Sequence, residues 1–247
     1  MDLGGTNVRA GLVKDGRIVR LLSEPCKADR PEGEVVDQIA SLIGKLITPD
    51  VARIGIGVPS VVDAARGIVY NVVGIPSWRE VYLKDLLEKR FGVPVYVNND
   101  CNCFALGVSR FGEASAYSDV VCVALGTGVG GAVISDGRMV AGANGAAGEF
   151  GHMTINPAET ETCACGRRGC VQQYVSASGI ARLARKYLAE HEEESALRSV
   201  EKLTTKDVFD AAKNGDGAAN AILENVYDAF GYAISAVCTV ADPEVVV

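Results

Sequence analysis

The segment from Gly148 to Cys170, GEFGHMTINPAETETCACGRRGC, constrains this chain more than any other stretch. It brings a carboxylate, an imidazole and three thiols into one glycine-rich segment, in which His152 precedes Cys163, Cys165 and Cys170. Three thiolates and one imidazole can complete a tetrahedral site around a cation such as Zn²⁺. Because four protein ligands leave no position open for water, we predict a structural zinc ion that folds this loop.

A second interpretation treats the three cysteines as small buried hydrophobic residues or as disulfide partners. Pro157, Gly166 and Gly169 make the segment a poor core element, and the spacing Cys-x-Cys-x4-Cys suits a knuckle around an ion. We therefore favour the metal site, which leaves Glu149 free for another partner. The other cysteines stand among apolar neighbours and are interpreted as buried thiols: Cys26, Cys101, Cys103, Cys122 and Cys238.

Charge and hydropathy exclude several classes of partner. The 247 residues carry 24 basic and 31 acidic side chains, and this net charge of −7 argues against nucleic acid or an anionic membrane as the main partner. With 48% hydrophobic residues, the chain is long enough to bury a core in two lobes. The sequence shows no apolar run of the roughly 20 residues that span a membrane and no signal peptide. We expect a cytoplasmic protein, in which thiols stay reduced.

Two glycine-rich turns lie between strand patterns. One precedes a hairpin with strands at residues 8–13 and 18–22, and the other separates strands at residues 120–124 and 132–134. Two such turns, each with a threonine, can hold a triphosphate from two sides with backbone amides and hydroxyls. No Gly-Lys-Ser or Gly-Lys-Thr follows, so neither turn is a Walker loop. The candidate phosphate-binding residues are Gly4, Gly5, Thr6 and Asn7 in the first turn and Gly126, Thr127 and Gly128 in the second.

Helix and strand patterns alternate between the two turns and predict an α/β fold. Helices are predicted at residues 32–47, 79–91 and 101–111, strands at 53–58 and 93–97, and further helices at 176–191, 204–213 and 216–240. Strand 93–97 ends in Asn98-Asn99-Asp100, and ligands of open α/β sheets bind beyond the carboxyl ends of strands. Asn99 and Asp100 are therefore candidate substrate residues, although Asp100 can also cap the following helix. Trp78 either stacks on a ligand or packs against helix 79–91.

Taken together, these motifs resemble the ROK sugar kinases of the actin, hexokinase and Hsp70 superfamily over nearly the whole chain. Asp2-Leu3-Gly4-Gly5-Thr6 and residues 125–131 resemble the two phosphate motifs of that family, and Asn99-Asp100 resembles the motif that ends in its catalytic aspartate. Residues 148–152 with the three cysteines are similar to the ROK signature, in which the glutamate and histidine contact sugar hydroxyls and the histidine and cysteines hold zinc. The resemblance implies a two-lobed ribonuclease H-like (actin/hexokinase-type) ATPase fold with mixed sheets flanked by helices.

The resemblance further implies an ATP-dependent hexokinase that converts glucose to glucose 6-phosphate, with ATP, Mg²⁺ and structural Zn²⁺. Asp100 would be the catalytic base, and the sugar would be bound by Asn99, Asp100, Glu149, His152 and Gln172. A kinase for fructose or an N-acetylhexosamine is the alternative within the class, and a ROK-type sugar-sensing repressor without its DNA-binding region is the alternative outside it. We expect lobes at residues 1–108 and 109–247, small-molecule sugar and MgATP as the partners, and a homodimer or homotetramer.

The sequence departs from the family pattern at two positions. Family members often carry Lys where Asn7 stands, and Leu-Glu where this chain has Val171-Gln172. That glutamate usually helps to bind the sugar, and glutamine keeps an acceptor but loses the charge. Only Met1, Asp2 and Leu3 precede Gly4, too few for the first strand of the family, and the chain stops at Val247, where the family's strand would run into a glycine turn, so we expect a truncated C-terminal lobe. Loss of the metal is expected to affect sugar binding and to leave nucleotide binding by the glycine turns nearly intact.

Overall fold

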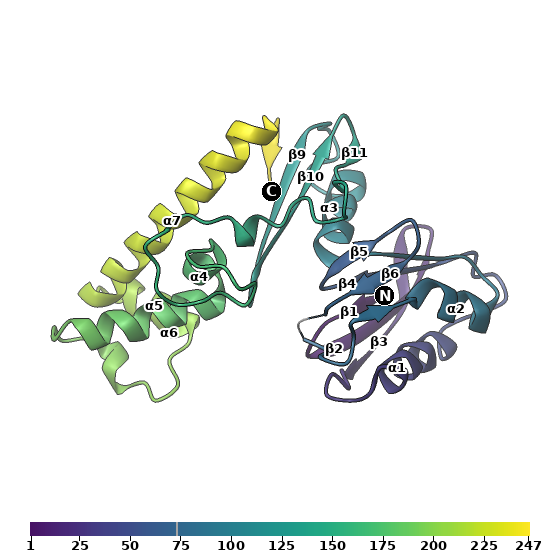
Figure 1. Ribbon diagram of the computed structural model, residues 1–247, viewed down its shortest axis with the longest axis horizontal. Helices are drawn as coiled ribbons and strands as arrows, with labels where there is room; N and C mark the ends of the chain where they lie inside the picture. The colour runs from purple at the N-terminus through teal and green to yellow at the C-terminus, as the bar shows by residue number, and fades with distance from the viewer. Residues whose placement is uncertain (73) are drawn as a thin grey trace. The chain divides into compact units, whose positions relative to one another are not determined.

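The computed structural model describes residues 1–72 and 74–247 (Figure 1). It divides into two compact units, of which unit 1 comprises Met1–Gly112 with Ala141–Ala147 and unit 2 comprises Glu113–Val140 with Gly148–Val247. The lobe boundary expected between residues 108 and 109 lies four residues before the end of the first segment of unit 1, and it stays a prediction. In the part of the chain described, no helix combines the length and the apolar character needed to cross a bilayer.

Unit 1 contains a mixed sheet with the strand order β3-β2-β1-β4-β8. Strand β1 is antiparallel to β2 and parallel to β4, which is parallel to β8. A smaller antiparallel sheet has the order β5-β6-β7. The elements of this unit are β1 (Asp2–Leu3), β2 (Asn7–Lys14), β3 (Arg17–Pro25), α1 (Glu32–Gly44), β4 (Ile54–Val58), β5 (Val61–Asp63), β6 (Ile68–Tyr70), β7 (Glu80–Val81), α2 (Leu83–Phe91), β8 (Val95–Asn99) and α3 (Asp100–Phe111).

Unit 2 combines a sheet of order β11-β10-β9-β12 with a helical cluster (Figure 1). Strands β9 and β10 are antiparallel over six residue pairs, and β12 is parallel to β9. Alanine, valine, isoleucine and leucine side chains of α5 and α7 fill the helical core. The elements are β9 (Val120–Leu125), β10 (Val129–Ser135), β11 (Arg138–Met139), η1 (Phe150–His152), α4 (Gln172–Val175), α5 (Ala177–Glu190), η2 (Ala196–Ser199), α6 (Thr205–Lys213), α7 (Gly217–Ala241) and β12 (Val245–Val246).

Most predicted elements are present, and the differences have local causes. Helix 79–91 begins only at Leu83, because Glu80–Val81 pairs with β6 as the edge strand β7. The helix predicted through residue 47 ends at Gly44, shortly before Pro49. Side-chain caps begin three helices of unit 2: Ser176 accepts from the Gly179 amide, Thr204 forms a capping box with Asp207, and Asp216 accepts from the Ala219 amide.

Burial settles the two interpretations of the tryptophan and corrects the one given for the isolated thiols. Trp78 is 1% exposed and belongs to the core of unit 1, so the ligand-stacking interpretation is wrong. Burial of the whole ring by apolar neighbours outweighs any gain from presenting it to a ligand. Cys122 is buried as predicted, whereas Cys26, Cys101, Cys103 and Cys238 are only partly buried.

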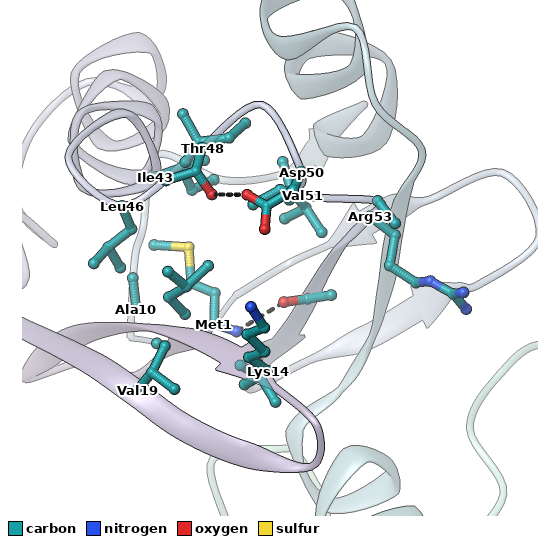
Figure 2. A pocket seen from close by; sticks show the side chains of 17 residues that line it. Met1, Ala10, Lys14, Val19, Ile43, Leu46, Thr48, Asp50, Val51 and Arg53 are labelled. Atoms are coloured by element: carbon teal, nitrogen blue, oxygen red, sulfur yellow. Dashed lines mark hydrogen bonds between the residues drawn. The ribbon is translucent and has the colours of Figure 1, made fainter.

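A cavity of about 640 Å³ lies in unit 1 between β2, the end of α1 and the loop that leads to β4 (Figure 2). It lies where β2 and β4 continue past the two residues of β1, and the Met1 ammonium donates to the Gly55 carbonyl there at 2.8 Å. Its walls are mostly apolar, and none of the predicted phosphate- or sugar-binding residues lines it.

Candidate functional site

The first glycine turn joins β1 to β2. The Gly4 amide donates to the Asn7 carbonyl at 2.9 Å, and the Cys26 amide donates to the Thr6 carbonyl at 2.8 Å, which ties the turn to the end of β3. A Cβ atom on Gly74 would lie 3.3 Å from the Cα atom of Gly5, so glycine at both positions lets the two backbones approach. Gly5 and Thr6 are exposed, and their backbone can face an anion.

Strand β8 delivers Asn99 and Asp100 to the start of α3. The Asn99 side chain accepts from the Asn102 amide at 3.1 Å and donates to the Ser60 carbonyl at 3.2 Å. Asn99 is therefore the N-cap of α3, and the interpretation of Asp100 as the cap is wrong. Asp100 is the first residue of the helix itself, because the strand continues two residues further than predicted.

The environment of Asp100 favours its protonated form. Burial raises the pKa of the Asp100 carboxyl above the ordinary 3.8, the hydrogen bond from the Cys101 amide opposes the shift, and the negative charge of Asp2 adds to it. A Cβ atom on Gly57 of β4 would lie 3.4 Å from the Cα atom of Asp100, so the strand and the helix start are packed together. A raised pKa makes the ionised carboxylate a stronger base, so Asp100 is suited to accept a proton from a bound hydroxyl.

The second glycine turn closes the hairpin of β9 and β10. Leu125 pairs with Val129, and the Gly126 amide donates to the Gly128 carbonyl at 3.0 Å. The start of α5 holds this turn from outside: the Ala177 amide donates to the Gly126 carbonyl at 2.9 Å, and the Ser178 hydroxyl donates to the Thr127 carbonyl at 2.8 Å. Sequence patterns predicted the hairpin but not its attachment to α5.

Glu149 and His152 lie at the two ends of η1, which packs against β10. Gly148 has φ +88°, and a Cβ atom on Gly151 would lie 2.2 Å from the Val129 carbonyl oxygen, so both positions require glycine. The Glu149 and His152 side chains are partly buried. Because Gly151 packs against Val129, the first residue of β10, η1 lies close to the second glycine turn, which ends directly before Val129.

The four predicted metal ligands form one cluster. The nitrogen of His152 and the sulfurs of Cys163, Cys165 and Cys170 all lie within 4.8 Å of one another. The Cys165 and Cys170 sulfurs are 3.6 Å apart, and the Cys163 sulfur is 3.8 Å from His152 Nδ1. Zn–S bonds of about 2.3 Å in a tetrahedron would place two sulfurs about 3.7 Å apart, so the spacing fits zinc.

The chemistry of this donor set also fits a cation. Burial, followed by hydrogen bonds that the Cys170 thiol donates to Cys165 and Cys163, raises the pKa of Cys170 to about 12. The Cys170 thiol therefore keeps its proton unless a positive charge compensates the thiolate, whereas the burial of Cys165 is outweighed by hydrogen bonds, chiefly from the Arg167 amide, which lower the pKa of Cys165. Since His152 presents Nδ1 to the cysteines, its Nε2 atom is the one left for a ligand outside the cluster.

Gln172, the residue that departs from the family pattern, lies beside this cluster. Its Nε2 atom donates to the Cys163 sulfur at 3.2 Å. Its Oε1 atom lies 3.4 Å from the position that a Cβ atom on Gly128 would take. The structure therefore brings Gln172 between the metal cluster and the second glycine turn, and its predicted contact with sugar stays a prediction.

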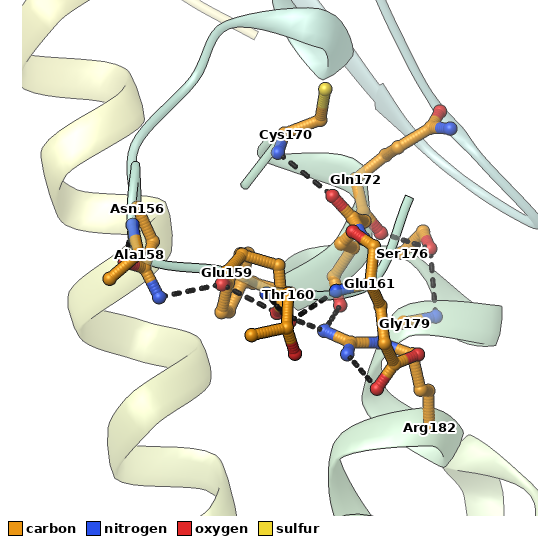
Figure 3. Close-up of polar contacts among 12 residues, drawn as sticks. Asn156, Ala158, Glu159, Thr160, Glu161, Cys170, Gln172, Ser176, Gly179 and Arg182 are labelled. Carbon is orange, nitrogen blue, oxygen red and sulfur yellow. Dashed lines mark hydrogen bonds and ion pairs between the residues drawn. The ribbon is translucent and has the colours of Figure 1, made fainter. Parts of the chain in front are cut away.

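A polar network that the sequence patterns did not predict contacts the metal loop, which is defined as residues 152–170 with the four predicted ligands (Figure 3). Arg182 of α5 contacts Glu159 at 3.1 Å and Glu161 at 2.9 Å, and the Tyr174 hydroxyl donates to Glu159 at 2.8 Å. Burial raises the pKa of Glu159, but hydrogen bonds from the Glu161 amide and Tyr174 and the charge of Arg182 more than offset it and lower the pKa to about 2. No periodic pattern links residues 159 and 182, so sequence spacing gave no signal.

Gln173 connects this network to the metal loop. Its Oε1 atom accepts from the Cys170 amide at 3.0 Å, and its Nε2 atom donates to the Glu161 carbonyl at 3.0 Å. Arg182 in turn donates to the Gln173 carbonyl at 3.0 Å. The backbone of Cys170, a predicted metal ligand, is thus held by Gln173 of α4, which Arg182 of α5 in turn contacts.

We expect the purified protein to contain about one zinc ion per chain, since four ligands complete one tetrahedral site. Cys165→Ser removes one thiolate and should reduce zinc to well below one equivalent and lower the melting temperature by a few degrees, because the loop loses its cross-link. Elemental analysis and calorimetry measure both quantities. Cys238→Ser, which changes a partly buried thiol of α7, is the matched control and should keep its zinc. Full stability in zinc-free wild-type protein would contradict the structural role.

Comparison with known proteins places the chain in one family. The model of the ROK family matches residues 1–247. A glucokinase of Halalkalibacterium halodurans is 35% identical over 257 residues, which cover 100% of this chain and 78% of the relative. The crystal structure of a ROK family glucokinase from Streptomyces griseus, in complex with glucose and AMPPNP, has a TM-score of 0.81 at 33% identity and covers 99% of this chain and 80% of that one.

The fold is also shared by a regulator. A ROK family transcriptional regulator, a homolog of the E. coli MLC protein, has a TM-score of 0.87 at 26% identity and covers 100% of this chain and 63% of that one. These likenesses confirm the α/β class with mixed sheets flanked by helices, of the actin/hexokinase type. The match of the family model to the whole chain and the 35% identity to a relative lead to one conclusion: the chain belongs to the ROK family.

Proposed function

We propose that the protein is an ATP-dependent sugar kinase that phosphorylates glucose to glucose 6-phosphate. The observation that carries this proposal is the Asp100 carboxyl at the carboxyl end of β8, whose pKa burial raises and which does not serve as the helix cap. Membership of the ROK family and the similarity to named glucokinases support the same reaction. The partners are then a small-molecule sugar and MgATP.

In this reaction Asp100 accepts the proton of a sugar hydroxyl while that oxygen attacks the γ-phosphorus of MgATP. The bond from the γ-phosphorus to the β,γ-bridging oxygen breaks, ADP leaves, and the proton passes from Asp100 to solvent after the product departs. The exposed residues of the two glycine turns, which include Gly5, Thr6, Thr127 and Gly128, are suited to hold phosphate oxygens, because glycine lets the backbone approach and threonine adds a hydroxyl donor. We assign this role to Gly4, Gly5, Thr6, Asn7, Gly126, Thr127 and Gly128.

Polar side chains are assigned to the proposed sugar contacts. Asn99 and Asp100 lie at the end of β8 and the start of α3, and Glu149, His152 and Gln172 lie beside η1 and the cysteine cluster. Carboxylates, an imidazole and amides offer both donors and acceptors to the hydroxyls of a hexose. Zinc would be held by His152 Nδ1 and the three cysteine sulfurs, where it would stiffen the loop that carries the imidazole.

Two alternatives remain distinct from this proposal. A kinase for fructose or an N-acetylhexosamine would use the same catalytic residues with a different sugar. A sugar-sensing regulator is favoured by the similarity to the MLC homolog, whose fold matches 100% of this chain, although this chain covers only 63% of that regulator. The presence of Asp100 and of both glycine turns favours the kinase, since a sensor needs neither a base nor a triphosphate site.

A coupled assay of ADP release across glucose, mannose, fructose, N-acetylglucosamine and N-acetylmannosamine tests the proposal. We expect the highest kcat/KM with glucose. A higher value with another sugar would reassign the substrate within the kinase class. Tight sugar binding by calorimetry without ADP release from any sugar would identify a sensor and contradict the kinase.

Thr127→Val tests the second glycine turn as a phosphate site. Loss of the hydroxyl removes one hydrogen bond to a charged phosphate, worth roughly 1.5 kcal/mol or more, so the KM for ATP should rise about tenfold. The KM for sugar should stay near its wild-type value. Thr239→Val, an exposed threonine on α7, is the matched control and should change neither constant. A rise confined to the KM for sugar would show that the turn has been assigned to the wrong substrate.

A further inference from the structure

We propose that Gln172 couples the metal cluster, formed by His152, Cys163, Cys165 and Cys170, to the second glycine turn at residues 126–128, so that zinc and nucleotide bind cooperatively. Gln172 is in this sense a positioning residue: it acts on the nucleotide site through the turn. The inference rests on the proposed function, because it takes the turn as a nucleotide site.

The first part of the coupling is a hydrogen bond to a metal ligand. Gln172 Nε2 donates to the Cys163 sulfur at 3.2 Å, and Cys163 is 5% exposed, so water has little access to that sulfur. A zinc-bound thiolate keeps part of its negative charge, and an N–H donor stabilises that charge. Partners of this kind orient the ligand and typically change metal affinity 10–100-fold.

The second part is a packing contact with the turn. The Oε1 atom of the same amide group lies 3.4 Å from the place of a Cβ atom on Gly128, so glycine lets the amide approach the turn backbone. Gly128 follows Thr127 and closes the turn by accepting from the Gly126 amide at 3.0 Å. A rotation of the Gln172 side chain that broke its bond to Cys163 would therefore also disturb Gly128.

The third part is the short chain path from the cluster to the turn. Gln172 stands two residues after the ligand Cys170 and begins α4, and its carbonyl accepts from the Ser176 hydroxyl at 2.6 Å. The next residues, Ala177 and Ser178, donate to the Gly126 and Thr127 carbonyls at 2.9 and 2.8 Å. The four residues of α4 therefore connect the ligand Cys170 to Ala177 and Ser178, which donate hydrogen bonds to the turn.

These contacts give the metal a role beyond the sugar side of the site. Without zinc, Cys163 and Cys170 are no longer held by a shared ion. Gln172 and the start of α5 then become more mobile, and so does the second glycine turn that they contact. Ordering the turn again costs part of the nucleotide binding energy. By reciprocity, bound nucleotide raises the affinity for zinc by the same factor. The independence of nucleotide binding expected from the sequence is therefore replaced by coupling.

The test measures the zinc dissociation constant by competition with a chromophoric chelator, with and without saturating Mg-AMPPNP. In the wild-type protein we expect AMPPNP to tighten zinc binding about tenfold, in the usual range of coupling between sites. In Gln172→Met, which keeps the side-chain length without hydrogen bonds, zinc binding without nucleotide should weaken about tenfold, and AMPPNP should no longer change it. Protein loaded with Co²⁺ in place of zinc should show a shifted thiolate charge-transfer band in the variant.

Two further variants separate the hydrogen bond from general effects on folding. Gln172→Glu keeps the acceptor proposed for sugar but loses the N–H donor, so it should weaken zinc binding like Gln172→Met and remains available if that variant does not fold. Ser178→Ala removes the hydrogen bond from the Ser178 hydroxyl to the Thr127 carbonyl and leaves the metal cluster unchanged. Its zinc affinity without nucleotide should therefore equal that of wild type.

The outcomes distinguish this inference from the proposed function. If AMPPNP binds the wild-type protein but leaves zinc affinity unchanged, or if the Gln172 variants keep the full nucleotide effect, the coupling is wrong and the kinase assignment stands. If AMPPNP does not bind at all, the proposed function itself fails.

Discussion

Asp100→Asn should lower kcat for sugar phosphorylation about 10²–10⁴-fold, the usual loss when a general base is removed. Asparagine keeps the size and hydrogen-bonding reach of aspartate, so the amide from Cys101 and the start of α3 should be preserved and sugar should bind nearly as well. Steady-state kinetics and calorimetry with sugar alone separate the two effects. An unchanged kcat would show that another group takes the proton.

The pH dependence of this variant provides an independent check. Because burial raises the pKa of Asp100 above its ordinary value, wild-type kcat/KM should fall as the pH drops through that raised pKa and the base becomes protonated. The acid limb should disappear in Asp100→Asn. Asp85→Asn is the matched control, since Asp85 is an exposed carboxylate in the first turn of α2, and its profile should follow that of wild type.

Arg182→Met should lower the free energy of unfolding by about 3–5 kcal/mol, the usual cost of removing one partner of a buried ion pair. Only 4% of the Glu159 side chain is exposed, so without Arg182 its charge has neither water nor a cation to compensate it. Methionine fills a similar volume, which limits the contribution of a cavity. Urea denaturation followed by circular dichroism measures the change.

Acid titration tests the same pair with a definite sign. The folded pKa of Glu159, about 2, lies below the ordinary 4.5, so its ionised form stabilises the folded state above pH 4.5, and that stability is lost as the pH falls towards 2. The shift corresponds to about 3 kcal/mol. In wild-type protein the free energy of unfolding should decline over this range, and in Arg182→Met the decline should be shallower, because the folded pKa rises when the guanidinium is removed.

Two variants control for effects unrelated to the pair. Arg185→Met changes an exposed arginine on the same helix and should cost less than about 1 kcal/mol. Glu159→Gln combined with Arg182→Met removes both charges and should recover part of the stability that the single variant loses. A single variant as stable as wild type would mean that the network does not hold the metal loop.

Local chemistry along the chain determined much of the site. The cluster of His152, Cys163, Cys165 and Cys170 was predictable because the three thiols lie within eight residues of one another, and short spacing keeps ligands close in almost any compact loop. The hairpin of β9 and β10 followed from apolar residues on both sides of a glycine turn. The N-caps at Ser176, Thr204 and Asp216 are likewise set by the three residues that follow each of them.

Only the tertiary structure decided which residues meet across long stretches of sequence. Strand β7 exists because β6 offers it a partner, and Trp78 is buried because the core of unit 1 surrounds it. Glu159 and Arg182 are 23 residues apart, and their pairing depends on how the metal loop returns to α5. Gln172 contacts both Gly128 and Cys163 because packing brings the β9–β10 hairpin, the cysteine-containing loop and α4 together. Spacing fixes local contacts through chain geometry, whereas distant contacts depend on the balance of burial and polar satisfaction over the whole fold.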